Sequence, residues 1–126
     1  MNIVYLPMTA DLFHVGHLRA IRKCSRIGRV VVGLLSDEVI EAYKGKKPII
    51  PFEQRKEIIE ALPEVSKVVR QESLRPNLKG MQYLASGDGF EKDEREAAQE
   101  YECQLFSFDY DPDQSTTKIK YLLKNR

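Results

Sequence analysis

The chain lacks the long apolar runs and the charge excess that mark several classes of protein. None of its hydrophobic stretches approaches the roughly 20 residues of a membrane-spanning helix, and its first residues lack the charged and apolar regions of a secretory signal. The net charge of the 126 residues is +1, so nothing draws the whole surface towards nucleic acid or a membrane. These absences predict a single cytoplasmic domain over residues 1–126 that binds neither.

Cysteine and histidine are scarce, with two of each. Cys24 and Cys103 lack the spacing of a metal motif. Their places on an apolar helix face and at a strand start predict buried free thiols. Both histidines, His14 and His17, fall within one four-residue stretch, so this stretch concentrates the imidazole chemistry of the chain.

The two histidines lie where a strand, a polar turn and a helix are predicted to meet. Residues 3–6 form a short apolar run, and apolar residues recur at helical spacing over residues 18–27. The free N–H groups and partial positive charge at the start of such a helix favour an anion. His14 and His17 can face one side of the first turn, and Gly16 between them lets a phosphate come close. The turn indicates a phosphate site, with partly exposed polar residues or half of a zinc site as alternatives.

The rest of the chain alternates predicted strands with predicted helices. The further strands are expected over residues 29–35, 65–70, 81–85 and 104–108. The further helices are expected over residues 37–42, 51–62 and 91–101, with a last one that begins near residue 115. This order predicts an α/β fold, a Rossmann-like doubly wound sheet of five mostly parallel strands with helices on both faces.

Polar segments follow the first, fourth and fifth predicted strands. Ligands bind beyond the carboxyl ends of the strands in doubly wound sheets, so we expect these segments to converge on one site. Their candidate binding residues are Thr9, Asp11, Gly87, Asp88, Ser115, Thr116, Thr117 and Lys120. The glycine–aspartate turn lets backbone approach a ligand, although it is also read as a plain turn, and the hydroxyl run supplies a helix cap and a second anion site.

Two further cationic features fall outside this pattern. Lys44, Lys46 and Lys47 surround a glycine, which reads either as a mobile phosphate-binding loop or as a solvated surface loop. Arg55 follows in the first turns of the next predicted helix. It reads either as a solvated charge or as an anion clamp that points into the site.

In these segments the chain resembles the HxGH nucleotidyltransferase superfamily. Residues 9–17, Thr-Ala-Asp-Leu-Phe-His-Val-Gly-His, are similar to the first signature, and residues 115–120, Ser-Thr-Thr-Lys-Ile-Lys, are similar to the second. The segment around Arg55 resembles the one with a phosphate-binding arginine, and Gly87–Asp88 resembles the turn at the base and ribose. The ordered set looks most like the cytidylyltransferases of the glycerol-3-phosphate and phosphonate types.

The resemblance implies transfer of CMP from CTP to a small phosphate- or phosphonate-bearing acceptor, with release of pyrophosphate. It implies that His14 and His17 donate hydrogen bonds to phosphate oxygens, that Lys44 and Lys46 close over the triphosphate, and that Arg55 holds phosphates. Asp11 is the candidate for orienting the site or the metal. Mg²⁺ is expected to bridge the phosphates with few protein ligands, and a homodimer is implied.

The chain departs from the family pattern at one cationic position. The arginine often found shortly before the second signature is absent, and residues 109–114 stand there as Asp-Tyr-Asp-Pro-Asp-Gln. Two other functions therefore stay open beside CMP transfer. These are an adenylyltransferase that uses ATP, because base choice rests largely on backbone groups, and a nucleotide-binding module without catalysis.

Overall fold

The structure, a computed structural model, describes residues 2–109 and 122–124. It contains one sheet of five parallel strands in the order β3-β2-β1-β4-β5. The strands are β1 (Ile3–Met8), β2 (Arg29–Leu35), β3 (Val65–Gln71), β4 (Tyr83–Ser86) and β5 (Gln104–Ser107). The predicted α/β class is confirmed, and the sheet is wholly parallel.

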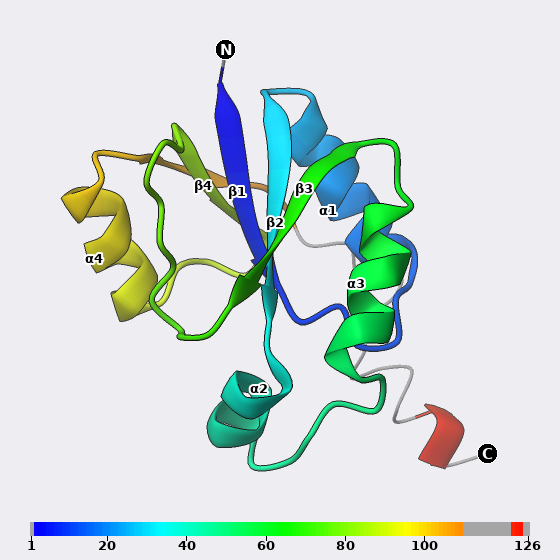
Figure 1. Ribbon diagram of the computed structural model, residues 1–126. Coiled ribbons are helices and arrows are strands. Elements are labelled where there is room, and N and C mark those ends of the chain that lie inside the picture. The colour runs from blue at the N-terminus through cyan, green and yellow to red at the C-terminus, as the bar shows by residue number, and fades with distance from the viewer. Residues whose placement is uncertain (1, 110–121, 125–126) are drawn as a thin grey trace.

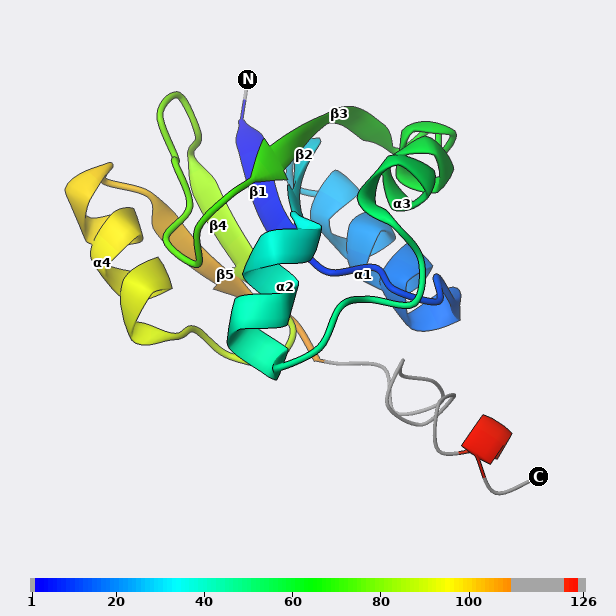
Figure 2. The ribbon, with the colours of Figure 1, turned by 60° about the horizontal axis from the view of Figure 1, so that its bottom comes forward.

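Helices cover both faces of this sheet and one of its ends. The helices are α1 (Val15–Ser25), α2 (Asp37–Lys44), α3 (Phe52–Glu60) and α4 (Lys92–Glu100). Figure 1 shows α1 and α3 on one face and α4 on the other. Figure 2 shows α2 across the end of the sheet, beyond the strands rather than on a face.

Alternation along β1 divides the core into two layers. Val4 and Leu6 face the layer that includes Ile21 of α1 and Ile59 of α3. Tyr5 points the other way, into the layer beneath α4. Side chains of a strand alternate between faces, and a fully buried Val, Leu or Ile contributes about 1.5–3 kcal/mol, so both layers stabilise the central strand.

The first helix begins three residues before its predicted start. His14 has extended backbone, with φ −143°, and its side chain accepts a hydrogen bond from the backbone of α1. It therefore acts as the N-cap, and His17 lies within the first turn. The other predicted boundaries agree with the observed elements to within one or two residues, and the predicted helix near residue 115 lies outside the described residues.

The thiol prediction is confirmed for one cysteine and wrong in part for the other. Cys24 is fully buried, and burial raises the pKa of its thiol to about 12. Cys103 is only half-buried because it precedes an edge strand.

The Tyr5 ring leaves no room for a side chain on the neighbouring strand. A Cβ added at Gly33 of β2 would overlap the Tyr5 ring and its hydroxyl. Tyr5 crosses this glycine and donates a 2.7 Å hydrogen bond to Oε1 of Gln71, at the end of β3. Gly33 therefore permits a contact that spans three strands.

Gly33→Ala is expected to reduce the free energy of unfolding by about 1–3 kcal/mol, because the added methyl overpacks the Tyr5 ring. Urea denaturation measures this loss. In a Tyr5→Leu background the same change should cost much less, since the ring is gone. An equal loss in both backgrounds would contradict the assignment.

Candidate functional site

A cavity of about 570 Å³ lies at the carboxyl ends of the strands. All five strands contribute to its wall at or just beyond their last residues, through Met8, Leu35, Gln71, Ser86 and Phe108. The cavity includes the ends of β1 and β4, the two neighbouring strands between which the direction of winding reverses. This is the switch point at which doubly wound sheets bind ligands, and the volume suits a small molecule.

The cavity wall brings together many of the residues predicted from sequence. Those on the wall are Thr9, Gly16, His17, Lys44, Gly87 and Asp88. Within the part of the chain that the structure describes, four others do not line the wall: Asp11, His14, Lys46 and Arg55. The predicted Ser115, Thr116, Thr117 and Lys120 lie outside the described residues.

The two imidazoles are fixed by backbone N–H groups of their own turn. Nδ1 of His14 accepts from the Gly16 N–H at 3.0 Å, and Nδ1 of His17 accepts from the His14 N–H at 3.1 Å. The ring centroids lie 4.0 Å apart, and Phe13 stacks on His17. An imidazole that accepts at Nδ1 carries its proton at Nε2, so neutral His17 on the cavity wall keeps Nε2–H as its donor.

Burial keeps His17 uncharged near neutral pH. Its pKa falls from the ordinary 6.5 to about 4, chiefly because of desolvation and then because of the nearby His14, while Asp11 opposes the shift. A neutral imidazole donates one hydrogen bond without bringing a full charge into the cavity. His17 is therefore suited to bind a phosphate oxygen as a dipole.

Asp11 binds backbone away from the cavity. It is 2% exposed, and its Oδ2 and Oδ1 accept from the N–H groups of Ile49 and Ile50, each at 2.9 Å. Its neighbours Ala10 and Leu12 have φ of 53° and 54°, a left-handed conformation that costs energy in residues other than glycine. This strained turn places Asp11 against the end of the lysine loop, so Asp11 orients that loop.

Arg55 does not point into the site as a phosphate clamp, which corrects the expectation. Its side chain is fully buried, and its guanidinium donates to the carbonyls of Ile50, Thr9 and Leu35 at 2.8–3.0 Å. Nη2 also forms a 2.6 Å ion pair with Asp37. Arg55 is therefore neither the solvated charge nor the clamp expected from the sequence, because it lies on the buried face of α3 with Phe52 and Ile59.

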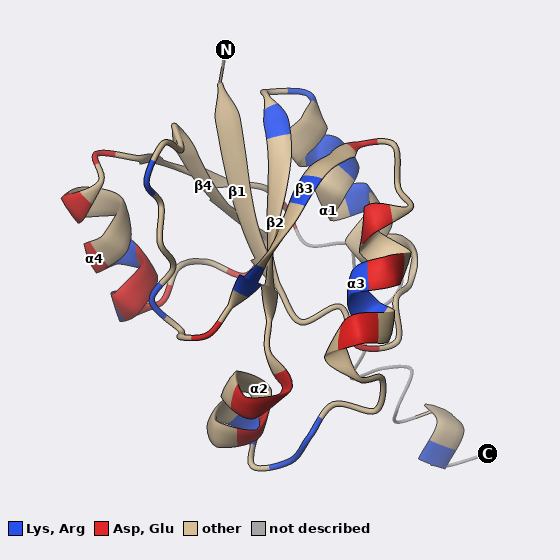
Figure 3. Cartoon of the chain, viewed as in Figure 1, with Lys and Arg blue, Asp and Glu red and all other residues tan. Residues whose placement is uncertain are grey.

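The lysines of the loop separate into two positions. Lys44 ends α2 and lines the cavity, whereas Lys46 is exposed and lies off the wall. Figure 3 shows positive charge along the connection between α2 and α3. Gly45 between the two lysines has φ 81°, so a glycine sets the direction of the chain at this point.

The Gly87–Asp88 turn forms the opposite side of the cavity mouth. Oγ of Ser86 accepts from the Asp88 N–H at 3.2 Å and donates to the Gly89 carbonyl at 2.5 Å. Gly89 has φ 89°. The turn is thus held by its own serine at the end of β4, where backbone meets the cavity.

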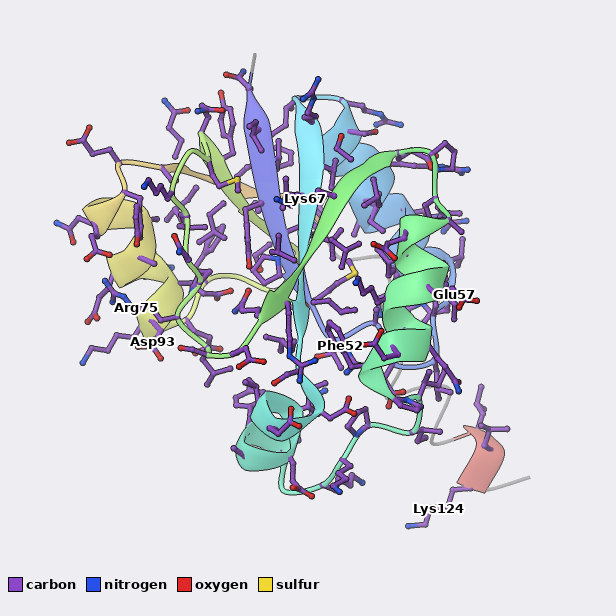
Figure 4. All side chains as sticks on the ribbon, in the orientation of Figure 1. Phe52, Glu57, Lys67, Arg75, Asp93 and Lys124 are labelled. Atoms are coloured by element: carbon purple, nitrogen blue, oxygen red, sulfur yellow. The ribbon has the colours of Figure 1, made fainter. Side chains whose placement is uncertain are left out.

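Sequence reasoning missed an acidic section of the wall. Glu91, Asp93 and Glu94, at the start of α4, line the cavity beside Asp88, and burial raises the pKa of Glu94. Figure 4 labels Asp93 on the first turn of α4. The sequence predicted a helix there but no part in the site. One feature of the sequence could have indicated this wall: the helix follows closely after the glycine–aspartate turn, which was itself predicted to lie at the site.

Gln71 is a second wall residue that the sequence did not single out. It is 6% exposed, and its carboxamide accepts from Tyr5 and donates to the Ser73 carbonyl at 2.8 Å. The Ser73 carbonyl can only accept, so it fixes which end of the amide is nitrogen, and the oxygen is left to accept from the Tyr5 hydroxyl. Burial also raises the Tyr5 pKa, so this orientation persists at physiological pH.

The family is established by a comparison over nearly the whole chain. A family model described as cytidylyltransferase-like matches residues 5–126. The chain belongs to the cytidylyltransferase-like family. The match spans residues 9–17 and 115–120 and all residues that line the cavity.

One curated relative adds a named activity on part of the chain. It is an ethanolamine-phosphate cytidylyltransferase from Arabidopsis thaliana, 37% identical over 67 residues. The match covers 52% of this chain but only 16% of that protein. The chain therefore corresponds to a small part of this relative.

Two solved structures share the fold. The lipopolysaccharide core biosynthesis protein of Thermoplasma volcanium superposes with a TM-score of 0.71 and 18% identity, covering 88% of this chain and 98% of that chain. A protein of unknown function from Archaeoglobus fulgidus gives 0.73 and 18%, with coverage of 91% and 94%. At this identity the likeness concerns the fold.

Two kinds of feature are absent from residues 2–109 and 122–124. No helix in these segments has the length and apolar character to cross a membrane. These same segments contain no group of three or more His, Cys, Asp or Glu residues arranged to hold a metal ion.

The lowered pKa of His17 predicts a loss of stability in acid. Below about pH 6.5 the unfolded chain protonates residue 17, whereas the folded chain resists until about pH 4, so falling pH favours unfolding across this window. The wild-type chain should lose about 2–3 kcal/mol more between pH 7 and pH 4 than His17→Asn. Urea denaturation at several pH values measures this, and parallel curves would contradict it.

Proposed function

We propose that this protein transfers CMP from CTP to a small phosphate- or phosphonate-bearing acceptor and releases pyrophosphate. The observation that carries the proposal is a shared cavity. A helix-capping histidine turn, Lys44 and the Gly87–Asp88 turn line one cavity at the switch point of a cytidylyltransferase-like fold. The named activity of the plant relative is of the same class.

The reaction needs positioning and charge stabilisation more than a side-chain nucleophile. An anionic oxygen of the acceptor attacks the α-phosphorus, and the bond from that phosphorus to the bridging oxygen breaks as pyrophosphate leaves. Charge grows on the oxygens around the α-phosphorus, where preorganised donors act most strongly. We assign the neutral Nε2–H of His17 to one of these oxygens, with Lys44 beside the triphosphate.

His14 does not line the cavity, and we assign it a positioning role within the histidine turn. Its Nδ1 caps α1 and its N–H orients His17, so it sets the position of the donor and of the helix N-terminus. Thr9 and Gly16 form the adjoining wall. The proposal retains Ser115, Thr116, Thr117 and Lys120 as a second anion site, from the resemblance alone.

Mg²⁺ remains part of the proposal. Mg²⁺ is usually held by substrate phosphates and waters with few protein ligands, so the wall carboxylates Asp88 and Asp93, on the side assigned to the base and ribose, are not assigned to it. An ion carried in by the nucleotide would neutralise phosphate charge. A homodimer and a cytoplasmic location also remain predictions.

A pyrophosphate-release screen tests this function. The purified chain is incubated with Mg²⁺ and either CTP or ATP, and with glycerol phosphate, ethanolamine phosphate, aminoethylphosphonate or hydroxyethylphosphonate as the acceptor. Release with CTP that depends on an acceptor supports the proposal. Release with ATP alone identifies an adenylyltransferase, and CTP binding without release identifies a binding module.

His17→Ala should fold but lose about 100-fold or more of its CMP transfer, because a preorganised donor to the developing charge is removed. Turnover with the acceptor that the screen identifies measures the loss. Arg22→Ala is the matched control, since Arg22 lies on the same helix but pairs with Glu64 at the surface. Near-normal turnover by His17→Ala would refute the assigned role.

A further inference from the structure

Ile50 is held on both edges of its backbone by buried side chains of opposite charge. Its N–H donates to Oδ1 of Asp11 at 2.9 Å, and its carbonyl accepts from Nε of Arg55 at 2.9 Å. The Ile49 N–H adds a second bond to Asp11. Asp11 and Arg55 are 2% and 1% exposed, and such charge-assisted bonds are the stronger kind. The end of the lysine loop is therefore anchored.

The same guanidinium joins this anchor to the cavity wall. Nη1 of Arg55 donates to the carbonyls of Thr9 and Leu35, just beyond β1 and at the end of β2, and both residues line the cavity. Nη2 pairs with Asp37, at the start of α2. A shift of Arg55 would therefore disturb two strand ends and the helix that carries Lys44.

The aromatic ring of Phe52 lies beside the guanidinium of Arg55. Phe52 at the start of α3 lies with its ring 5.6 Å from the Arg55 guanidinium and 4.5 Å from that of Arg70, and Figure 4 labels it between α3 and the sheet. Its N–H also approaches Asp37, at 3.4 Å. Arg70 pairs in turn with Glu38. Phe52 therefore covers the guanidinium of Arg55, whose hydrogen bonds go to three backbone carbonyls and to Asp37.

The chain between α2 and this anchor carries the loop lysines. Lys44 ends α2, the Gly45 N–H caps the helix by donating to the Glu41 carbonyl at 2.8 Å, and residues 46–48 connect to the anchored Ile49. The path of Lys46 is thus set by one helix end and by the bonds from Asp11 and Arg55. Neither of these two residues lines the cavity.

We infer that Arg55, together with Asp11 and Asp37, positions the Lys44–Lys46 segment for the nucleotide and does not itself bind phosphate. The anchor follows from contacts within the chain, while its effect on the nucleotide rests on the proposed function. Arg55 and Asp37 are positioning residues in this assignment. Asp37 is a residue that sequence reasoning treated only as part of a helix start.

Amide hydrogen exchange tests the anchor without any ligand. Arg55→Lys and Asp37→Asn should each raise the exchange rate of the Ile49 and Ile50 amides by about tenfold or more, because a charge-assisted bond is lost. Glu38→Gln is the matched control. It removes a neighbouring charge in the same helical turn but belongs to the Arg70 pair, so these amides should stay as in wild type.

Protected amides in β1 verify that each variant is folded. If Arg55→Lys does not fold, Asp37→Asn and Asp11→Asn decide the question. Unchanged exchange at Ile49 and Ile50 in the folded variants would overturn the anchor. Equal acceleration in Glu38→Gln would also overturn it, because the effect would then come from general loss of charge at α2.

A double-mutant cycle tests the effect on the nucleotide. Arg55→Lys should raise the KM for CTP by about tenfold with a smaller change in kcat, and Lys46→Ala should also raise it. Because Arg55 acts through the lysine segment, Lys46→Ala should add less than about twofold in the Arg55→Lys background. Independent, multiplying effects would show that Arg55 acts on phosphate directly and would overturn the inference.

The two proposals fail in different ways. If the wild-type chain uses neither CTP nor ATP, the proposed function fails, and hydrogen exchange still decides the anchor. If transfer is normal in wild type but the cycle is additive, the positioning role fails and the proposed function stands.

Discussion

The structure of the site depends on the burial of one positive charge. The Arg55 guanidinium is removed from water and is compensated by Asp37 and three backbone carbonyls. Burial of an ion costs several kcal/mol unless its donors are satisfied, and most donors of this fork meet an acceptor. The carbonyls belong to segments far apart in sequence, so this compensation requires the strand ends and the loop to take one arrangement.

Satisfied hydrogen bonds also organise the histidine turn, here between imidazoles and backbone N–H groups. His14 and His17 each accept a backbone N–H at Nδ1, so donors left open by the helix start are met within the turn. This use of Nδ1 leaves Nε2 as the protonated nitrogen of both neutral rings. Capping the helix and presenting a donor are therefore two results of one hydrogen-bond pattern, which explains why both imidazoles fall in one turn.

Periodicity and turn chemistry sufficed to predict the fold. Short apolar runs with helical segments between them indicated a parallel sheet, and the positions of Thr9, His17 and Gly87 after strands placed them at a common edge. This worked because the carboxyl ends of parallel strands meet on one side. The information is local in the sequence, and the topology adds only the order of the strands.

The direction of individual side chains was not predictable in this way. Arg55 shares the buried face of α3 with Phe52 and Ile59, but its charge is accommodated there only because three carbonyls and Asp37 converge on it. Asp11 turns to Ile49 and Ile50 for the same kind of reason. Such choices depend on acceptors supplied by distant segments, and a single sequence does not reveal these pairings.

The cavity is electrostatically uneven, and this bears on how a nucleotide would lie in it. Lys44 lies on the α2 side, whereas Asp88 and three acidic residues at the start of α4 outnumber Lys92 on the other side, which is therefore mainly acidic. A polyphosphate is repelled by carboxylates and attracted by lysine. The triphosphate is therefore expected towards Lys44 and the helix start at His17, which directs the less charged base and ribose towards Gly87 and Asp88.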